Sequence, residues 1–274
     1  MLARNLLGRV QYRLYFSAHK GRYIRLAVAR GLDQTFRTTR WRIARLSRFS
    51  RQRVDHVASP EIHQIGRRQY LLTHSPLKGR STQVTFCGRI WFGRFVLHSR
   101  RLRFPSYSRF FDYRGASYAI AKNAQMFRID SNFVKRSRIK ADLNQALKPS
   151  GADETLEIRH PFVLEIDGEL LCFFTRVGDL PERILASRII GLEVGEPRFT
   201  PAIEVLRPEY PFEGSELALE PSARGEAKDK RNELRDPYIF RENGQTYLLY
   251  SVMGESGIAL GQLDEKLLIR RLLD

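Results

Sequence analysis

The chain has 274 residues, of which 42% are hydrophobic and 28% charged, proportions typical of a folded protein rather than a disordered one. It contains no run of 18 apolar residues and no apolar stretch after its first arginines, so we expect neither a transmembrane helix nor a signal peptide, and therefore a cytoplasmic protein. The two cysteines, Cys87 and Cys172, lie far apart in apolar stretches, which predicts two buried free thiols and no metal site.

The formal net charge of +17 is spread unevenly along the chain. Residues 1–150 contain 32 Lys and Arg against 6 Asp and Glu, a net charge of +26, whereas residues 151–274 contain 15 against 24, a net charge of −9. A segment with a net charge as high as that of residues 1–150 can attract an anionic polymer such as a nucleic acid or an acidic polysaccharide. However, its arginines are scattered among strand-like stretches without a compact run, and an arginine-rich composition with no binding role explains them equally well.

Two strands joined by a tight turn recur along the chain with a period of about 50 residues. Each copy begins with a polar residue, usually followed by Pro, and continues with alternating apolar residues, a turn with Gly and a second apolar run. Four segments share this pattern: 59–75, 108–123, 160–176 and 236–252. The Asp167-Gly168 and Asn243-Gly244 pairs favour two-residue hairpin turns.

Further strands are expected after the hairpins and near the start of the chain. They are predicted at 12–18, 22–29, 82–87, 124–129, 183–189 and 257–263. Repeated units of three or four antiparallel strands are typical of propeller blades, and no segment shows the capped amphipathic stripe of a long helix.

The sequence therefore predicts one all-β domain over residues 1–274, a five-bladed β-propeller whose first blade is incomplete. The expected blades are approximately 8–50, 56–100, 107–150, 157–206 and 234–274. A β-sandwich is the structural alternative, although it would not require the polar-Pro opening to recur in register.

Three short segments resemble known carbohydrate enzymes. Residues 234–237 (LRDP) resemble the Arg-Asp-Pro element of family 43 and family 32 glycoside hydrolases, and residues 254–258 (GESGI) resemble a stretch found in the same blade of those enzymes. Residues 159–161 (RHP), with 178–184 downstream, resemble uncharacterised bacterial relatives of that group. The resemblance agrees with the propeller prediction.

The resemblance implies a hydrolase that cleaves a glycosidic bond in a central funnel. Such enzymes need one carboxyl group as a proton donor, one as a base or nucleophile, and a further one that orients the substrate and tunes the acid. The resemblance implies the orienting role for Asp236, beside which Arg235 would hold a carboxylate or a sugar hydroxyl. Other residues occupy the matching positions of the remaining units: Ser59, Ser108 and His160.

Active members of these families have acids at several such positions, and this chain has no acid before Asp33. We therefore expect a glycoside hydrolase-like protein that acts on or binds a carbohydrate, with a catalytically inactive glycan-binding or protein-binding propeller as the alternative. No cofactor is expected. The oligomeric state is left open by the sequence.

Acids at other positions can take the place of those missing from the strand openings. We expect the catalytic carboxylates to be Asp236, Glu220 and Glu61. Glu61 lies two residues beyond Ser59, on the same face of its strand. Glu220 lies in the long irregular segment 207–234, and a loop of this length is either functional or mobile.

Further residues are candidates for substrate binding: Asp55, His56, Arg159, His160, Arg183, Glu213 and Arg235. Glu255 is an additional candidate acid. Asp179, Glu182 and Arg183 form either a turn with a local ion pair or a part of the site. Each candidate also has a plain structural explanation, such as a turn-forming Asp before Pro or a solvated loop carboxylate.

Overall fold

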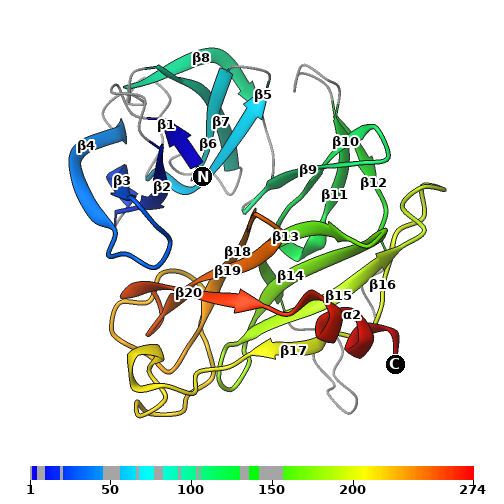
Figure 1. Ribbon diagram of the computed structural model, residues 1–274. Helices are drawn as coiled ribbons and strands as arrows, with labels where there is room; N and C mark the ends of the chain where they lie inside the picture. The colour runs from blue at the N-terminus through cyan, green and yellow to red at the C-terminus, as the bar shows by residue number, and fades with distance from the viewer. Residues whose placement is uncertain are drawn as a thin grey trace. The chain divides into compact units, whose positions relative to one another are not determined.

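Five antiparallel β-sheets contain most of the residues that the structure describes (Figure 1). The computed structural model describes residues 2–4, 10–18, 21–45, 56–65, 68–76, 83–91, 94–102, 105, 107–129, 136–141 and 157–274. The chain divides into two compact units, Met1–Ser106 and Tyr107–Asp274. Over these described ranges, no helix is long and apolar enough to cross a membrane.

The unit Met1–Ser106 contains two four-stranded sheets in which consecutive strands are neighbours. The first comprises β1 (Leu2–Arg4), β2 (Val10–Ser17), β3 (Tyr23–Ala29) and β4 (Arg37–Arg45). The second comprises β5 (Ala58–Ile65), β6 (Arg68–Pro76), β7 (Gln83–Trp91) and β8 (Arg94–Leu102). The first sheet does have an opening strand, β1, which pairs with β2 but is only three residues long as described. The expected incompleteness of the first blade stays a prediction, because residues 1 and 5–9 lie outside the described residues.

The unit Tyr107–Asp274 contains the other three sheets. One comprises β9 (Arg109–Tyr113), β10 (Ala116–Ile120), β11 (Met126–Ile129) and β12 (Arg136–Ile139). The next comprises β13 (Glu157–Ile166), β14 (Glu169–Val177), β15 (Ile184–Ile190), β16 (Arg198–Phe199) and β17 (Ile203–Leu206). The last comprises β18 (Arg235–Glu242), β19 (Gln245–Val252) and β20 (Gly257–Leu263). The β13–β17 sheet packs against both of the others through β13 and β14.

The hairpin turns predicted from Asp-Gly and Asn-Gly are confirmed. Asp167 and Gly168 have φ of 50° and 81°, and Asn243 and Gly244 have φ of 51° and 73°. Positive φ at both central residues defines the type I′ turn, whose twist matches that of the strands that it joins. These turns set the register of β13 with β14 and of β18 with β19.

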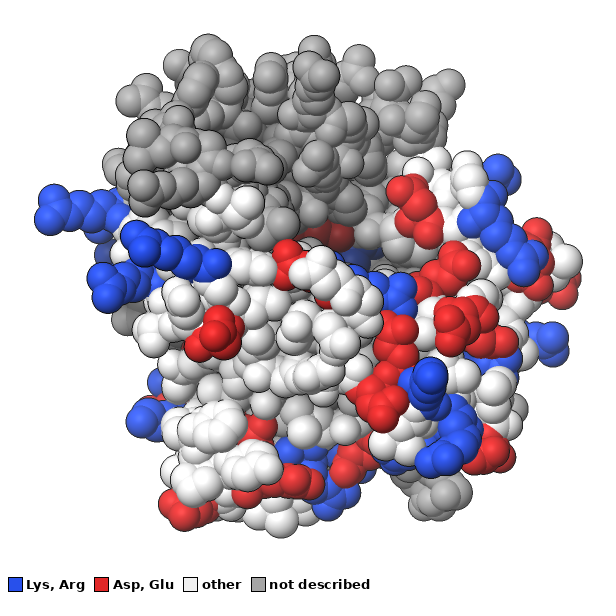
Figure 2. Space-filling view, in the orientation of Figure 1, with Lys and Arg blue, Asp and Glu red and all other residues white. Residues whose placement is uncertain are grey.

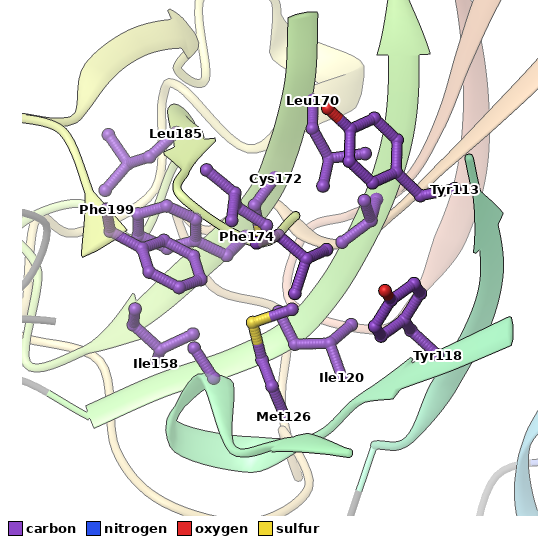
Figure 3. Packing of buried hydrophobic residues seen from close by; sticks show 14 residues of the cluster. Tyr113, Tyr118, Ile120, Met126, Ile158, Leu170, Cys172, Phe174, Leu185 and Phe199 are labelled. Carbon is purple, nitrogen blue, oxygen red and sulfur yellow. The ribbon is translucent and has the colours of Figure 1, made fainter. Parts of the chain in front are cut away.

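The central strand β14 is buried on both faces. Leu170, Cys172 and Phe174 lie in the core shared with the β9–β12 sheet (Figure 3). Leu171 and Phe173 lie in the core shared with the β18–β20 sheet. Because successive side chains of a strand point to opposite faces, this continuous apolar run holds two neighbouring sheets at once. Cys172 is a buried free thiol as predicted, whereas the side chain of Cys87 lies outside the described residues.

A short helix, α2 (Glu265–Leu273), closes the chain and was not predicted. The Asp264 side chain accepts a hydrogen bond of 2.9 Å from the Leu267 N–H, which caps the first turn. Leu268 and Leu272 lie four residues apart on one face and pack into the core of the last two sheets. The helix therefore belongs to the packing of the unit rather than to a site.

Candidate functional site

The polar-Pro opening of the hairpins forms a bulge in three opening strands. Ser59, His160 and Asp236 have φ of 48°, 54° and 52°, and the strand register shifts at each of them. Residues other than glycine rarely adopt positive φ, and a bulge redirects a side chain out of the regular pleat. The following proline has no N–H to donate, which suits a break in the hydrogen-bond ladder.

The backbone N–H of a bulge residue can bind a side chain of the preceding sheet. Within Met1–Ser106, the Ser59 N–H donates to Ser17 Oγ at 3.0 Å. Within Tyr107–Asp274, the Asp236 N–H donates to His160 Nδ1 at 3.4 Å. The bulges therefore join neighbouring sheets at the start of their opening strands.

His160 and Asp236 form a pair between β13 and β18. His160 Nε2 lies 3.3 Å from Asp236 Oδ1, while Nδ1 accepts the backbone N–H of Asp236. An imidazole that accepts at Nδ1 and faces a carboxylate at Nε2 is the neutral tautomer with its proton on Nε2. Burial lowers the pKa of His160 to about 4, although the Asp236 charge opposes this shift. His160 is therefore neutral at pH 7, and its ring packs edge-on against Tyr107 at a centroid distance of 4.4 Å.

Asp236 is the ionised member of the site. Its Oδ2 accepts a hydrogen bond of 3.1 Å from Ser251 Oγ, and 34% of its side chain is exposed. Desolvation raises the pKa of Asp236, but His160, Arg109 and Arg235 together with the Ser251 hydrogen bond outweigh it and hold the pKa below its ordinary value. The result is a carboxylate that is fixed in place, charged at neutral pH and open to solvent on one side.

Glu255, in the turn between β19 and β20, is a second carboxyl group with the opposite tendency. Burial and the nearby charge of Asp236 raise its pKa, and both outweigh the lowering effect of Arg235. Arg235 Nη1 donates to Glu255 Oε1 at 3.0 Å, and 29% of the Glu255 side chain is exposed. Two neighbouring carboxyl groups whose pKa values are pushed apart can divide the roles of proton donor and charged partner.

A buried arginine directly precedes each of the bulge residues His160 and Asp236 in the sequence. Arg159 and Arg235 are both 1% exposed and share the buried carboxylate of Glu182. Arg235 also pairs with Glu233, whose side chain is likewise buried. Of the residues predicted for substrate binding, Arg159, His160 and Arg235 are therefore brought together with Asp236, but the two arginines contact other protein groups.

Two further predicted residues serve the loop that precedes β18. Glu220 is 59% exposed and pairs with Arg231 at 3.0 Å. Glu213 is buried, and its carboxylate accepts the Glu209 N–H at 2.9 Å and the Tyr250 hydroxyl at 2.7 Å. Both side chains make their contacts within the loop or with its neighbours.

The remaining predicted residues are Arg183, Glu61, His56 and Asp55. Arg183 is 3.3 Å from Glu204 and 3.7 Å from Asp179, which corresponds to the local ion pair considered above. Glu61, on β5, is buried, and His56 precedes that strand; both belong to Met1–Ser106 rather than to the unit that carries Asp236. Asp55 lies outside the described residues.

Ser251 and Tyr107 were missed by the sequence prediction. Counting back from the Asn243-Gly244 turn places Ser251 opposite Asp236, so the hairpin pattern contained a signal for it. The bulge shifts the actual partner of Ser251 to Arg235, yet the Ser251 hydroxyl still reaches Asp236. Tyr107 lies outside the strands, and no feature of the sequence connects it to His160.

The described charges on one face of the molecule are mixed in sign. On the face shown in Figure 2, acidic and basic side chains of the described residues lie intermixed, in agreement with exposed pairs such as Arg207–Glu204. Among the described residues, no group of three or more His, Cys, Asp or Glu side chains could hold a metal ion.

Comparison with known proteins defines the fold. No family model matches the chain. Among solved structures, the Cellvibrio cellulosa alpha-L-arabinanase complexed with arabinohexaose matches with a TM-score of 0.63 and 12% identity, over 97% of this chain and 92% of that one. An endo-arabinase from Bacteroides thetaiotaomicron matches with a TM-score of 0.61 and 12% identity, over 96% and 93%. The chain has an all-β propeller fold.

A third solved structure, a GH43_1 enzyme from Xanthomonas citri complexed with xylose, matches with a TM-score of 0.61 and 10% identity, over 96% of this chain and 86% of that one. At such low identity these likenesses establish the fold alone, and they set aside the β-sandwich alternative. One curated relative, an uncharacterized protein of Acanthamoeba polyphaga mimivirus, is 39% identical over 111 residues. That match covers 39% of this chain and 30% of the relative, so the chain spans less than a third of its length.

Proposed function

We propose that this propeller acts on a carbohydrate, as a glycoside hydrolase-like protein whose five sheets are the five blades. The observation that carries the proposal is the pair of carboxyl groups on the last sheet: Asp236, which contacts His160 and Ser251, and Glu255, which accepts a hydrogen bond from Arg235. The opposite directions of their pKa shifts support it. The fold neighbours support it, since two are named as an endo-arabinase and an alpha-L-arabinanase and one was solved with xylose.

In this proposal Glu255 is the general acid. Its raised pKa keeps a larger share of the carboxyl group protonated near neutral pH, which is what protonation of a leaving-group oxygen requires. The charge of Asp236 is one cause of that raised pKa, so Asp236 favours the protonated form of the acid. Its solvent-facing side can also accept hydrogen bonds from sugar hydroxyls, which is the orienting role implied by the Arg-Asp-Pro resemblance.

Hydrolysis needs a second carboxylate that activates water or attacks the sugar. The contacts of Glu220 with Arg231 argue against that role for Glu220. Glu61, two residues after the Ser59 bulge in the unit Met1–Ser106, stays the sequence-based prediction for that role.

A catalytically inactive propeller that binds a glycan or a protein is the second candidate function. The observation that favours it is the set of residues at the openings of the other strands, which are not acids: Ser59, Ser108 and His160. Such a protein would bind without cleavage, and Asp236 and Glu255 would then contact hydroxyl groups only.

A panel of aryl glycosides that includes arabinofuranosides and xylosides separates the two functions. The chain is compared with Asp236→Asn, Glu255→Gln and the control Glu220→Gln, whose carboxylate pairs in the exposed loop. We expect turnover that falls by roughly 10²–10⁴-fold in Glu255→Gln and stays near wild type in the control. Sugar binding without turnover in the wild type would support the inactive propeller, and neither turnover nor binding would reject both.

A further inference from the structure

One buried carboxylate connects both arginine-preceded bulges of the unit Tyr107–Asp274. Glu182 has no exposed surface. It accepts a hydrogen bond of 2.7 Å from Arg159 Nε and a second one from Arg159 Nη2. Its Oε2 also lies 3.2 Å from Arg235 Nε. A single side chain therefore faces the arginine of each Arg-x-Pro sequence.

The two arginines use their remaining donors in parallel ways. Arg159 Nη1 donates to the carbonyl of Ala223 at 3.1 Å, and Arg235 Nη1 donates to the carbonyl of Gly225 at 3.1 Å. Both carbonyls belong to the loop that leads into β18. The guanidinium groups thus hold this loop against the starts of β13 and β18.

Arg235 also connects the buried network to the surface. The same Nη1 that binds Gly225 donates to Glu255 Oε1 at 3.0 Å. The direction of the Glu255 carboxyl group therefore depends on the orientation of Arg235. On the buried side of the guanidinium, Glu233 accepts a hydrogen bond from Nη2, and the Glu182 carboxylate lies 3.2 Å from Nε as an ion pair without a hydrogen bond.

The backbone supports the same arrangement. Glu182 and Glu233 form an isolated parallel bridge, and the Leu234 N–H donates to the Glu182 carbonyl at 2.9 Å. The Gly254 N–H donates to the Glu233 carbonyl at 3.0 Å, directly before Glu255. Side-chain and backbone contacts thus connect the segment around Glu182 to the turn between β19 and β20, which carries Glu255.

We propose that Glu182 is a positioning residue of the site, which through Arg159 and Arg235 fixes both bulges and sets the place and the charge environment of Glu255. The inference rests on the proposed function, in which Glu255 is the acid. Glu182 touches no substrate in this account and acts only through the arginines. Buried ion pairs often add little net stability, because desolvation of the charges offsets their attraction. Stability alone therefore does not explain the buried Glu182, whereas a positioning role does.

The test is the Glu182→Gln variant. Glutamine has nearly the same shape but removes the negative charge, so Arg235 is left with fewer partners and its charge acts more strongly on Glu255. We expect the Glu255 carboxyl group, followed by carbon-detected NMR titration, to have a lower pKa in the variant than in the wild type. If turnover is present, the basic limb of its pH profile should move to lower pH, with a larger change in kcat than in KM.

The matched control is Asp179→Asn, which removes a buried carboxylate of the same unit whose partners are Arg176 and Arg183. Both variants should melt at a lower temperature than the wild type, but only Glu182→Gln should change the titration of Glu255. An unchanged Glu255 titration in a folded Glu182→Gln would show a merely structural residue and overturn the proposal.

Two further readouts cover the case in which Glu182→Gln does not fold. Glu182→Asp keeps the charge and shortens the side chain, and it should also displace the Glu255 titration. In the wild type, the Arg159 Nε–H should exchange slowly with water, because it is buried and bonded to Glu182. Rapid exchange would contradict the network itself. The titration needs no turnover, so a lack of glycosidase activity would reject the proposed function without deciding the role of Glu182.

Discussion

The openings of β13 and β18 have the same backbone and different chemistry. Each has a buried arginine, a bulge residue with φ near 50° and a proline. The bulge residue is a buried, neutral imidazole at His160 and a partly exposed, ionised carboxylate at Asp236. The repeat therefore gives both strand openings the same backbone arrangement of arginine, bulge residue and proline. The side chain of the bulge residue alone decides whether that position carries a charge.

The largest loss of stability should come from replacing the buried arginine at either strand opening. Arg235→Met leaves the buried carboxylates of Glu182 and Glu233 with fewer partners, and Arg159→Met leaves Glu182 in a similar state. Removal of one partner from a buried ion pair costs about 3–5 kcal/mol, so both variants should unfold at much lower denaturant concentration.

The exposed pair of Arg207 and Glu204 is the control, since 48% of the Arg207 side chain is exposed. Arg207→Met should change the free energy of unfolding by about 0–1 kcal/mol. Equal losses in Arg235→Met and Arg207→Met, measured by denaturant titration, would contradict the central role of the buried arginines.

The two bulge residues should also act in different pH ranges. The pKa of His160 falls from 6.5 in the unfolded chain to about 4 in the folded one, so the unfolded state binds more protons between these values. Stability should therefore decrease by about 3 kcal/mol as the pH falls from 6.5 to 4, and it should be unaffected by His160 above 6.5. The pKa of Asp236 is lowered, so its contribution is present above 3.8 and is lost only as the pH falls below that value.

His160→Gln should remove most of the dependence between pH 6.5 and 4, and it should also weaken the acid limb of Asp236, because His160 is the largest of the causes that lower the pKa of Asp236. The measurement is a series of denaturant titrations across this pH range for the wild type and the variant. Parallel stability curves for the two proteins would show that His160 does not have the lowered pKa.

A smaller effect distinguishes the residues across from the two bulges. Ser251 pairs with Arg235 in the strand register and donates to Asp236, whereas Thr175 pairs with Arg159 and its buried hydroxyl has no partner among the described residues. Ser251→Ala should therefore cost about 1 kcal/mol and raise the pKa of Asp236. Thr175→Val keeps the shape without the unsatisfied hydroxyl and should stabilise the fold by about 1 kcal/mol.

These two changes are measured by the same denaturant titrations, and their opposite signs are the result that matters. Destabilisation of similar size in both variants would show that the two openings do not differ at this position.

The last prediction concerns binding by the basic half of the chain, residues 1–150. If residues 1–150 bind an anionic polymer through their net charge of +26, affinity for heparin should fall steeply between low and moderate salt. Binding that is absent at low salt would leave the arginines without such a role.

The sequence predicted the hairpins well because their signals are local. Asp-Gly and Asn-Gly pairs require positive φ, and the alternating residues around them suit strands, so the turns at Asp167 and Asn243 could be placed before the structure was known. The bulges could not be placed, since a polar residue before proline is compatible with an ordinary strand start. Helix α2 was missed because nine residues are too few for a clear periodic pattern.

The repeat pointed to residues that lie close together in the structure, whereas contacts that depend on tertiary pairing had no local signal in the sequence. Asp236, Arg235 and His160 stand at repeat openings, and the structure brings them together. Glu182 and Glu233 are far apart in the sequence and meet through a single parallel bridge that no local pattern reveals. Glu220 and Glu213 looked equally available in the sequence, but the structure gives both of them partners of their own.

The most direct test of this account is the titration of Asp236 and Glu255 in the wild-type chain by carbon-detected NMR of the side-chain carboxyl groups. We predict that Asp236 titrates below 3.8, its ordinary value, and that Glu255 titrates above 4.5, because burial and the Asp236 charge raise its pKa. In Asp236→Asn, the pKa of Glu255 should fall. Ordinary values for both groups, or a Glu255 pKa that does not respond to Asp236→Asn, would contradict the assignment of acid and charged partner.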